Sequence, residues 1–186
     1  MTKTPSYAIL GYPKLSSRDE KWIRDLRVRF DELYGEFVEP HVTFVFPLQG
    51  LEAPRIAEHM RAVARDLRPV PFVLRCALIV KDAFREHTHI FLVPDEGFAA
   101  LVRIHTRLYT GDLRRFLRLE IPYIPHLGIA NSLDAQECKD VADDLNETEI
   151  EIPGVVRSLD LVRLQGRTLE TLVSVPLKDG EPESED

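Results

Sequence analysis

This sequence has few cysteines, its apolar runs are short, and its first residues are polar. Each of these features excludes a class of protein. The 186 residues include two cysteines, Cys76 and Cys138. Their separation matches no metal-ligand spacing, so we expect two small buried hydrophobic residues rather than a disulfide. The longest apolar runs fall far short of the roughly 20 residues that cross a membrane. Residues 1–6 are too polar to begin a signal peptide. We therefore expect a cytoplasmic protein with no membrane association.

Basic residues are outnumbered, which limits the partners that the chain can bind. Lysine and arginine total 24 against 31 aspartate and glutamate, which gives a net charge of −7 at pH 7. This balance argues against an extended basic groove for nucleic acid. Residues 179–186 hold five acids and no base, and we predict an acidic, disordered tail there, after a single domain over residues 1–178. The rest of the chain then carries −2, a charge compatible with a small anionic ligand or an RNA end.

The sequence does contain one short pattern twice. PHVTF spans residues 40–44, and PHLGI spans residues 125–129. Successive side chains of a strand point to opposite faces, so His41 and Thr43 share one face, as do His126 and Gly128, while the apolar residues between them share the other. Each copy therefore predicts a buried strand that presents a histidine and a small residue. Two such strands could bring two imidazoles to one cleft.

Two facing imidazoles suit phosphoester chemistry. Imidazole has an ordinary pKa of about 6.5, so near neutral pH one ring can accept a proton while a protonated partner donates one, without a metal. The Thr43 hydroxyl could donate to a phosphoryl oxygen. Either histidine alone would be read as a core imidazole with a satisfied hydrogen bond. The repeated proline, apolar frame and two-residue step favour the functional interpretation.

These motifs resemble those of the two-histidine (2H) phosphoesterases, the superfamily that includes 2'-5' RNA ligase-like proteins and cyclic phosphodiesterases. Their signature is a pair of His-x-Thr/Ser motifs with apolar neighbours, and HVTFVFP, residues 41–47, matches the first closely. YIPHLGIA, residues 123–130, matches the second in its histidine and surroundings. Gly128 stands where the family usually has Thr or Ser, and Asn131 stands where several members have a basic residue.

The resemblance implies a metal-independent enzyme that hydrolyses, or reversibly ligates, a 2',3'-cyclic phosphate or a 2'-5' phosphodiester of RNA or a nucleotide. His41 and His126 would be the catalytic acid and base, with no cofactor and no metal. The substrate-binding residues would be Thr43, Gly128, Asn131 and Tyr123. We expect a monomer whose partner is this substrate. The alternative is a catalytically weakened module that binds a nucleotide or RNA end, and the missing hydroxyl at position 128 is its best support.

The pattern of elements predicts an α+β fold. Strands are expected over residues 7–10, around residue 41, over residues 72–80 and 89–93, and around residue 126, and residues 158–164 and 168–176 read as a hairpin around Gly166. A helix should begin at a capping box of Ser17 and Glu20, a second near Pro54, and others over residues 98–108 and 133–145. Because the order recurs, we expect two pseudo-symmetric lobes in successive halves, each an antiparallel sheet with helices on its outer side, with the active cleft between them.

The remaining histidines are weaker candidates. His59 and His105 fall on expected helices and are interpreted as surface or boundary residues. His87 and His89 have strand spacing that places both rings on one face, so a metal site is conceivable. Such a site would need third and fourth ligands, and the local sequence does not announce them.

Overall fold

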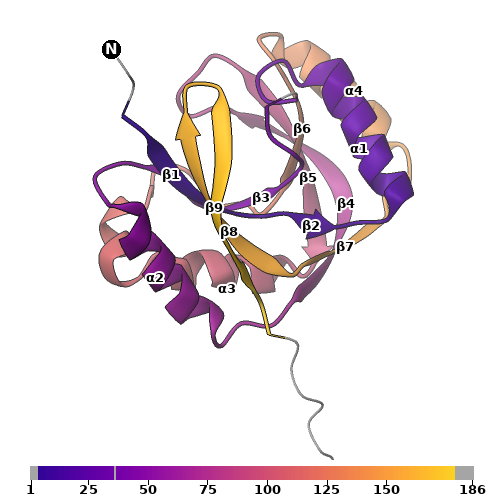
Figure 1. Ribbon diagram of the computed structural model, residues 1–186. Coiled ribbons are helices and arrows are strands. Elements are labelled where there is room, and N and C mark those ends of the chain that lie inside the picture. The colour runs from indigo at the N-terminus through magenta and orange to yellow at the C-terminus, as the bar shows by residue number, and fades with distance from the viewer. Residues whose placement is uncertain (1–3, 36, 179–186) are drawn as a thin grey trace, which may run out of the picture.

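The computed structural model is described over residues 4–35 and 37–178, and the expected tail at residues 179–186 lies outside the described residues. The expected strands and helices are present (Figure 1), but the strands at residues 13–14 and 152–156 and the 3-10 helix at residues 111–116 were not predicted. In chain order the elements are β1 (Ser6–Gly11), β2 (Pro13–Lys14), α1 (Ser17–Phe30), β3 (Val42–Leu48), α2 (Ala53–Ala64), β4 (Val70–Lys81), β5 (Thr88–Glu96), α3 (Phe98–Leu108), the 3-10 helix η1 (Gly111–Phe116), β6 (Leu127–Ser132), α4 (Ala135–Asn146), β7 (Ile152–Val156), β8 (Ser158–Gln165) and β9 (Thr168–Pro176).

Two antiparallel sheets form the framework, as expected for an α+β fold. The first sheet has the strand order β3-β1-β8-β9, and the second has the order β2-β7-β4-β5-β6. Both strands that follow the motif histidines, β3 and β6, are edge strands. The C-terminal hairpin turns at Gly166, whose φ of 64° lies in the left-handed region that glycine adopts without strain.

Helices cover the outer side of each sheet. Helices α1 and α4 pack against the second sheet, while α2 and α3 pack against the first (Figure 1). The expected capping box at Ser17 and Glu20 is wrong by one residue. Ser16 is the N-cap of α1 and accepts a hydrogen bond from the Asp19 backbone, because Ser17 already lies in the first turn. Pro54 occupies the first turn of α2, as predicted.

The two sheets do not correspond to successive halves of the chain, so that prediction is wrong. Strand β4 lies in the first half of the chain, yet it pairs with β5 and β7 in the second sheet. Strands β8 and β9, at the C-terminal end of the described chain, complete the first sheet beside β1. Sequence periodicity identifies a strand, but the partner of a strand is decided by distant residues.

One hydrophobic core joins the sheets. It contains Phe44 and Leu161 from the first sheet and Leu74 and Leu92 from the second, all essentially inaccessible to solvent. Cys138 is buried, and its thiol donates to the Thr88 carbonyl at 3.3 Å. Both cysteines are unpaired, and Cys76 is exposed, so its expected burial is wrong. Cys76 alternates along β4 with the buried Ala77, whose side chain points to the opposite face of the strand. Within the described residues, no helix has both the length and the apolar character needed to cross a membrane.

Candidate active site

The two motif histidines occupy equivalent places. His41 is the residue immediately before β3, and His126 is the residue immediately before β6. Each therefore stands at the start of an edge strand, one in each sheet. The repeated sequence pattern thus corresponds to a repeated structural position.

The same hydrogen bond fixes both imidazole rings. Nδ1 of His41 lies 2.8 Å from the carbonyl oxygen of Glu39, and Nδ1 of His126 lies 2.6 Å from that of Ile124. A carbonyl oxygen can only accept, so Nδ1 carries the hydrogen in both rings and Nε2 of the neutral imidazole keeps a lone pair. In each case the accepting residue precedes a proline, which restricts that residue to extended backbone. The proline of each motif therefore helps to aim the carbonyl that orients the histidine.

Both histidines are neutral at pH 7. Burial lowers the pKa of His41 to about 4 against the opposing effect of its bond to the Glu39 carbonyl. Burial likewise lowers the pKa of His126 to about 4, against the opposing effect of its bond to the Ile124 carbonyl. Electrostatic repulsion from His41 acts on the pKa of His126 in the same direction as burial. Nearby Arg27 lowers the pKa of His41 and Asp31 raises it.

Aromatic rings support each histidine on one side. The Tyr12 ring meets His41 edge to face, with centroids 6.2 Å apart. Phe91 of β5 stacks on His126 at a centroid separation of 3.5 Å and an interplanar angle of 11°. The apolar stack contributes to the burial that keeps His126 uncharged.

The small residues of the motifs have unobstructed surroundings. Thr43 lies two residues beyond His41 on β3 and is half-buried, and its hydroxyl makes no hydrogen bond within the described part of the chain. Gly128 lies opposite Phe91 in the pairing of β5 and β6, on the strand that His126 precedes. A Cβ atom built on Gly128 would meet no heavy atom within 4 Å. Position 128 therefore has room for a larger side chain or for a ligand.

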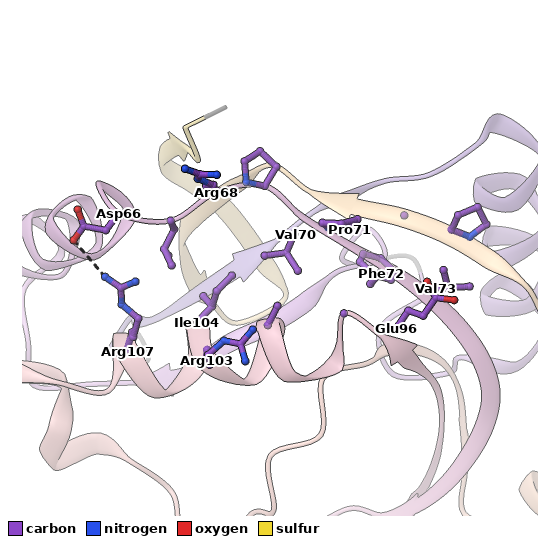
Figure 2. Close-up of a pocket in the computed structure, with 16 residues that line it drawn as sticks. Asp66, Arg68, Val70, Pro71, Phe72, Val73, Glu96, Arg103, Ile104 and Arg107 are labelled. Atoms are coloured by element: carbon purple, nitrogen blue, oxygen red, sulfur yellow. Dashed lines mark hydrogen bonds and ion pairs between the residues drawn. The ribbon is translucent and has the colours of Figure 1, made fainter. Parts of the chain in front are cut away.

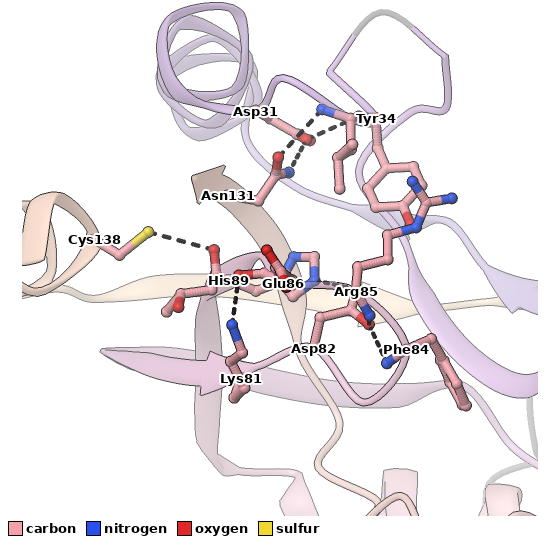
Figure 3. Close-up of polar contacts among 12 residues, drawn as sticks. Asp31, Tyr34, Lys81, Asp82, Phe84, Arg85, Glu86, His89, Asn131 and Cys138 are labelled. Atoms are coloured by element: carbon pink, nitrogen blue, oxygen red, sulfur yellow. Dashed lines mark hydrogen bonds and ion pairs between the residues drawn. The ribbon is translucent and has the colours of Figure 1, made fainter. Parts of the chain in front are cut away.

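The side-chain amide of Asn131 connects β6 to the loop after α1 by hydrogen bonds. Its Oδ1 accepts from the Leu33 backbone at 3.2 Å, and its Nδ2 donates to Asp31 (Figure 3). The side chain is 2% exposed. Both ends of the amide are thus used within the protein.

The last predicted substrate-binding residue, Tyr123, stacks on His105 at a centroid separation of 3.6 Å. Its hydroxyl is buried without a hydrogen-bond partner among the described residues. Burial raises the pKa of Tyr123, which keeps the hydroxyl protonated and able to donate. His105 itself is 7% exposed, so its interpretation as a surface or boundary residue is wrong. It points inward to donate from Nδ1 to the Phe44 carbonyl of β3 at 2.8 Å.

The structure also contains a buried ion pair near the site that sequence reasoning missed. Arg27 and Asp31 are each 4% exposed in their side chains, and their charged atoms are 3.1 Å apart. Arg27 also donates to the Tyr34 carbonyl at 3.0 Å, and Asp31 accepts from the Tyr34 backbone at 2.9 Å. The four-residue spacing of Arg27 and Asp31 was visible in the sequence. Such pairs on a helix are usually exposed, so the sequence did not predict that this pair is buried.

His87 and His89 do not form the beginnings of a metal site. Nε2 of His89 lies 2.8 Å from Asp82, and Nδ1 of His87 is buried without a partner in the described structure. Over residues 4–35 and 37–178, no group of three or more His, Cys, Asp or Glu is placed to hold a metal ion.

A groove of about 680 Å³ lies away from the motif histidines. Figure 2 shows it between α3, which presents Arg103, Ile104 and Arg107, and the start of β4, which includes Val70 and Phe72. Neither His41 nor His126 lines it. The groove is therefore distinct from the candidate site.

Comparisons with known proteins agree with this geometry. The family model for the 2'-5' RNA ligase superfamily matches residues 15–168. The fold is similar to TT0787 of Thermus thermophilus, with a TM-score of 0.61, 13% identity, and coverage of 92% of this chain and 97% of that one. It is also similar to E. coli LigT complexed with ATP, with a TM-score of 0.57, 12% identity, and coverage of 95% and 100%.

A third similar structure is Usb1 of Kluyveromyces marxianus, with a TM-score of 0.54, 11% identity, and coverage of 95% of this chain and 99% of that one. No curated protein matches the chain in sequence. Identities this low show a shared fold and leave the substrate to be inferred from the site.

Proposed function

Because the chain belongs to the 2'-5' RNA ligase superfamily, we propose that it is a 2H phosphoesterase acting on a 2',3'-cyclic phosphate or a 2'-5' phosphodiester of RNA or a nucleotide. The observation that carries the proposal is the equivalent placement of His41 and His126, each with Nδ1 bonded to a backbone carbonyl and Nε2 left with a lone pair. Solved structures of E. coli LigT with 3'-AMP, ATP and NADP+ support a nucleotide substrate for a protein of this fold.

In hydrolysis, Nε2 of one histidine takes a proton from water as the water oxygen attacks phosphorus. The other histidine gives its Nε2 proton to the ribose oxygen as the bond from phosphorus to that oxygen breaks. Both rings are neutral at pH 7 without substrate, but a phosphoryl anion between them favours a proton on one ring. Ligation is the reverse reaction and exchanges the two roles.

Other residues stabilise the phosphoryl group. The Thr43 hydroxyl and the backbone N–H near Gly128 would donate to its oxygens, where negative charge develops. Asn131 and Tyr123 are proposed to shape the site. Asn131 fixes the loop after α1 to β6. Tyr123, three residues before His126 in the sequence, packs on His105.

The proposal is tested with His41→Ala and His126→Ala. Each should lower turnover of a 2',3'-cyclic nucleotide by roughly 10²- to 10⁴-fold, the usual scale of general acid–base catalysis. A nitrophenyl phosphodiester separates the roles, because nitrophenolate departs without a proton. On that substrate the variant that lacks the acid should lose much less activity than the variant that lacks the base, so the comparison assigns the two roles. Unchanged turnover of the cyclic nucleotide in either variant would remove the two-histidine mechanism.

A nucleotide-binding module without turnover is the second candidate, and the missing hydroxyl at Gly128 favours it. Gly128→Thr addresses it directly, since the position has open space for the side chain. One added hydrogen bond of about 1 kcal/mol should raise turnover about fivefold in an enzyme. An inactive wild type that binds a cyclic nucleotide, with no turnover gained in Gly128→Thr, would support the module.

A further inference from the structure

The two motif histidines come from different sheets, so no shared strand ladder fixes one ring against the other. The strand after His41, β3, is an edge strand of the first sheet, and the strand after His126, β6, is an edge strand of the second. Acid–base catalysis by two imidazoles needs one fixed geometry, and a misplacement of about 1 Å can cost roughly 10²-fold in rate. Contacts outside the strand ladders therefore have to fix His41 relative to His126.

Asp31 and Asn131 join the loop after α1 to the outer edge of β6. Their backbones form a parallel bridge. The amide of Asn131 adds two hydrogen bonds, because Oδ1 accepts from the Leu33 backbone at 3.2 Å and Nδ2 donates to Oδ1 of Asp31 (Figure 3). Asn131 lies on β6, the strand that begins immediately after His126. The second motif strand is thus bonded to a loop that leads to the first motif.

Both carboxylate oxygens of Asp31 are used in this connection. Oδ1 accepts from the Tyr34 backbone at 2.9 Å and from Asn131, and Oδ2 accepts from Nε of Arg27 at 3.1 Å. The side chains of Arg27 and Asp31 are each 4% exposed, and Asn131 is 2% exposed. A charge is costly to bury unless it is paired and hydrogen-bonded, and a buried network whose members are bonded to one another is rigid. These three side chains form what we call the Arg27–Asp31–Asn131 network.

The carbonyl of Tyr34 extends the network toward His41. It accepts from a terminal nitrogen of Arg27 at 3.0 Å and from the Val38 backbone at 3.2 Å. Val38 is followed by Glu39, whose carbonyl accepts from Nδ1 of His41 at 2.8 Å. Hydrogen bonds and a single peptide link therefore connect the network, and with it β6, to the ring of His41.

We propose that Arg27 and Asp31 are positioning residues, which act with Asn131 to hold the carbonyl that orients His41 in a fixed place relative to β6 and so to His126. The three side chains bond to one another and to the loop, so the network acts without contacting substrate. The effect on turnover rests on the proposed function. The connection between the two motifs does not, and it can be measured in the ligand-free protein.

The first experiment records the Nδ1–H proton signal of His41 by NMR in the ligand-free protein. Asn131→Ala removes the side-chain link between β6 and the loop, and Asp31→Asn removes the charge that pairs with Arg27. Each substitution should shift the His41 signal, because the Glu39 carbonyl loses its fixed place. Asn131→Ala changes no charge, so a shift in that variant reports a displaced hydrogen bond rather than an altered electric field.

Asp25→Asn is the matched control. Asp25 pairs with Lys21 at the same four-residue spacing on α1, but these side chains are 65% and 75% exposed. The control should leave the His41 signal unchanged. Thermal melting checks that each variant is folded, and Asn131→Ala is the milder change, because it leaves the carboxylate of Asp31 and its charged partner in place. A His41 signal that keeps its wild-type position in Asn131→Ala overturns the proposal.

Turnover of a 2',3'-cyclic nucleotide gives the second measurement. In the folded variants Asn131→Ala and Asp31→Asn, kcat should fall roughly 10- to 100-fold with little change in KM, because the groups assigned to the phosphate are retained. The double variant should lose little more than the worse single variant, since both changes interrupt one network. An unchanged kcat, or a rise in KM confined to Asn131→Ala, overturns the positioning role, and the second result would identify Asn131 as a substrate contact. If the His41 signal shifts while the wild type has no activity, the proposed function fails and the connection between the motifs stands.

Discussion

At the scale of single residues, the orientation of the motif histidines follows from their local sequence. Each histidine donates to the carbonyl two positions earlier, across a proline. That arrangement needs three consecutive residues, which is why a pattern in the sequence could identify both rings. The burial that lowers their pKa values depends on Phe91 and other distant residues, so the sequence could not give it.

For other residues, distant partners decide the surroundings. His105 was expected near the surface, and that prediction is wrong, because His105 bonds to β3 and stacks on Tyr123. Asn131 is predicted to bind substrate, and both ends of its amide also bond to the loop after α1. Hydrophobic periodicity describes neighbouring residues and does not predict contacts between distant ones. His105 and Phe44 are 61 positions apart, and Leu33 and Asn131 are 98 positions apart.

The histidine pair should make stability depend on pH. The pKa of each is about 4 in the folded protein, against about 6.5 when unfolded, so the unfolded chain binds protons more tightly. The neutral histidines contribute fully to the free energy of unfolding above about pH 6.5, and this contribution is lost as the pH falls from about 6.5 to 4. The loss is on the order of 3 kcal/mol for each histidine. The free energy of unfolding, measured in urea, should therefore fall more between about pH 7.5 and 4.5 for the wild type than for His126→Ala. Equal losses would contradict the lowered pKa of His126.

At the scale of elements, α3 replaces the missing neighbour of edge strand β3. His105 donates to the Phe44 carbonyl, and the Tyr109 hydroxyl accepts from the Phe46 backbone at 3.0 Å. Both side chains are buried. An edge strand otherwise presents unpaired N–H and C=O groups. The helix thereby fixes the strand that follows His41.

Tyr109→Phe should lower the free energy of unfolding, because it removes the hydrogen bond between the Phe46 N–H and the Tyr109 hydroxyl. The substitution keeps the ring but leaves the Phe46 N–H without its acceptor, which costs about 1–3 kcal/mol for a buried group. The free energy of unfolding in urea measures the loss. Tyr7→Phe is the control, since the Tyr7 hydroxyl makes no hydrogen bond in the described structure. A loss in Tyr109→Phe no larger than that in the control would show that water satisfies the Phe46 N–H.

Helices and strands were largely predictable, and their assembly was not. Apolar periodicity gave α3 its bounds of Phe98–Leu108, and the turn at Gly166 gave the C-terminal hairpin. The assignment of β4 to the first lobe failed because a strand that alternates its faces can join either sheet. Pairing with β5 and β7 decides the matter, and β7 begins 71 residues after the last residue of β4.

At the scale of the whole molecule, the charge distribution limits how substrate is held. The chain carries −7, so a polyanionic strand gains no general attraction from it. The donors that we assign to the phosphoryl group, the Thr43 hydroxyl and the backbone near Gly128, act at short range. Affinity should therefore come from one or two phosphate contacts, together with the contacts of the base and ribose.

This view predicts a weak dependence of binding on salt. Each phosphate contact to a single strand contributes a slope of about −0.7 in the logarithmic plot of affinity against salt. For an oligonucleotide ending in a 2',3'-cyclic phosphate, raising the salt from 50 to 200 mM should increase Kd by about three- to sevenfold. Measuring a cyclic mononucleotide in parallel isolates the terminal phosphate, and its Kd should change by a similar factor. A change for the oligonucleotide above a hundredfold would require many more phosphate contacts and would reveal a basic path for the strand that the net charge conceals.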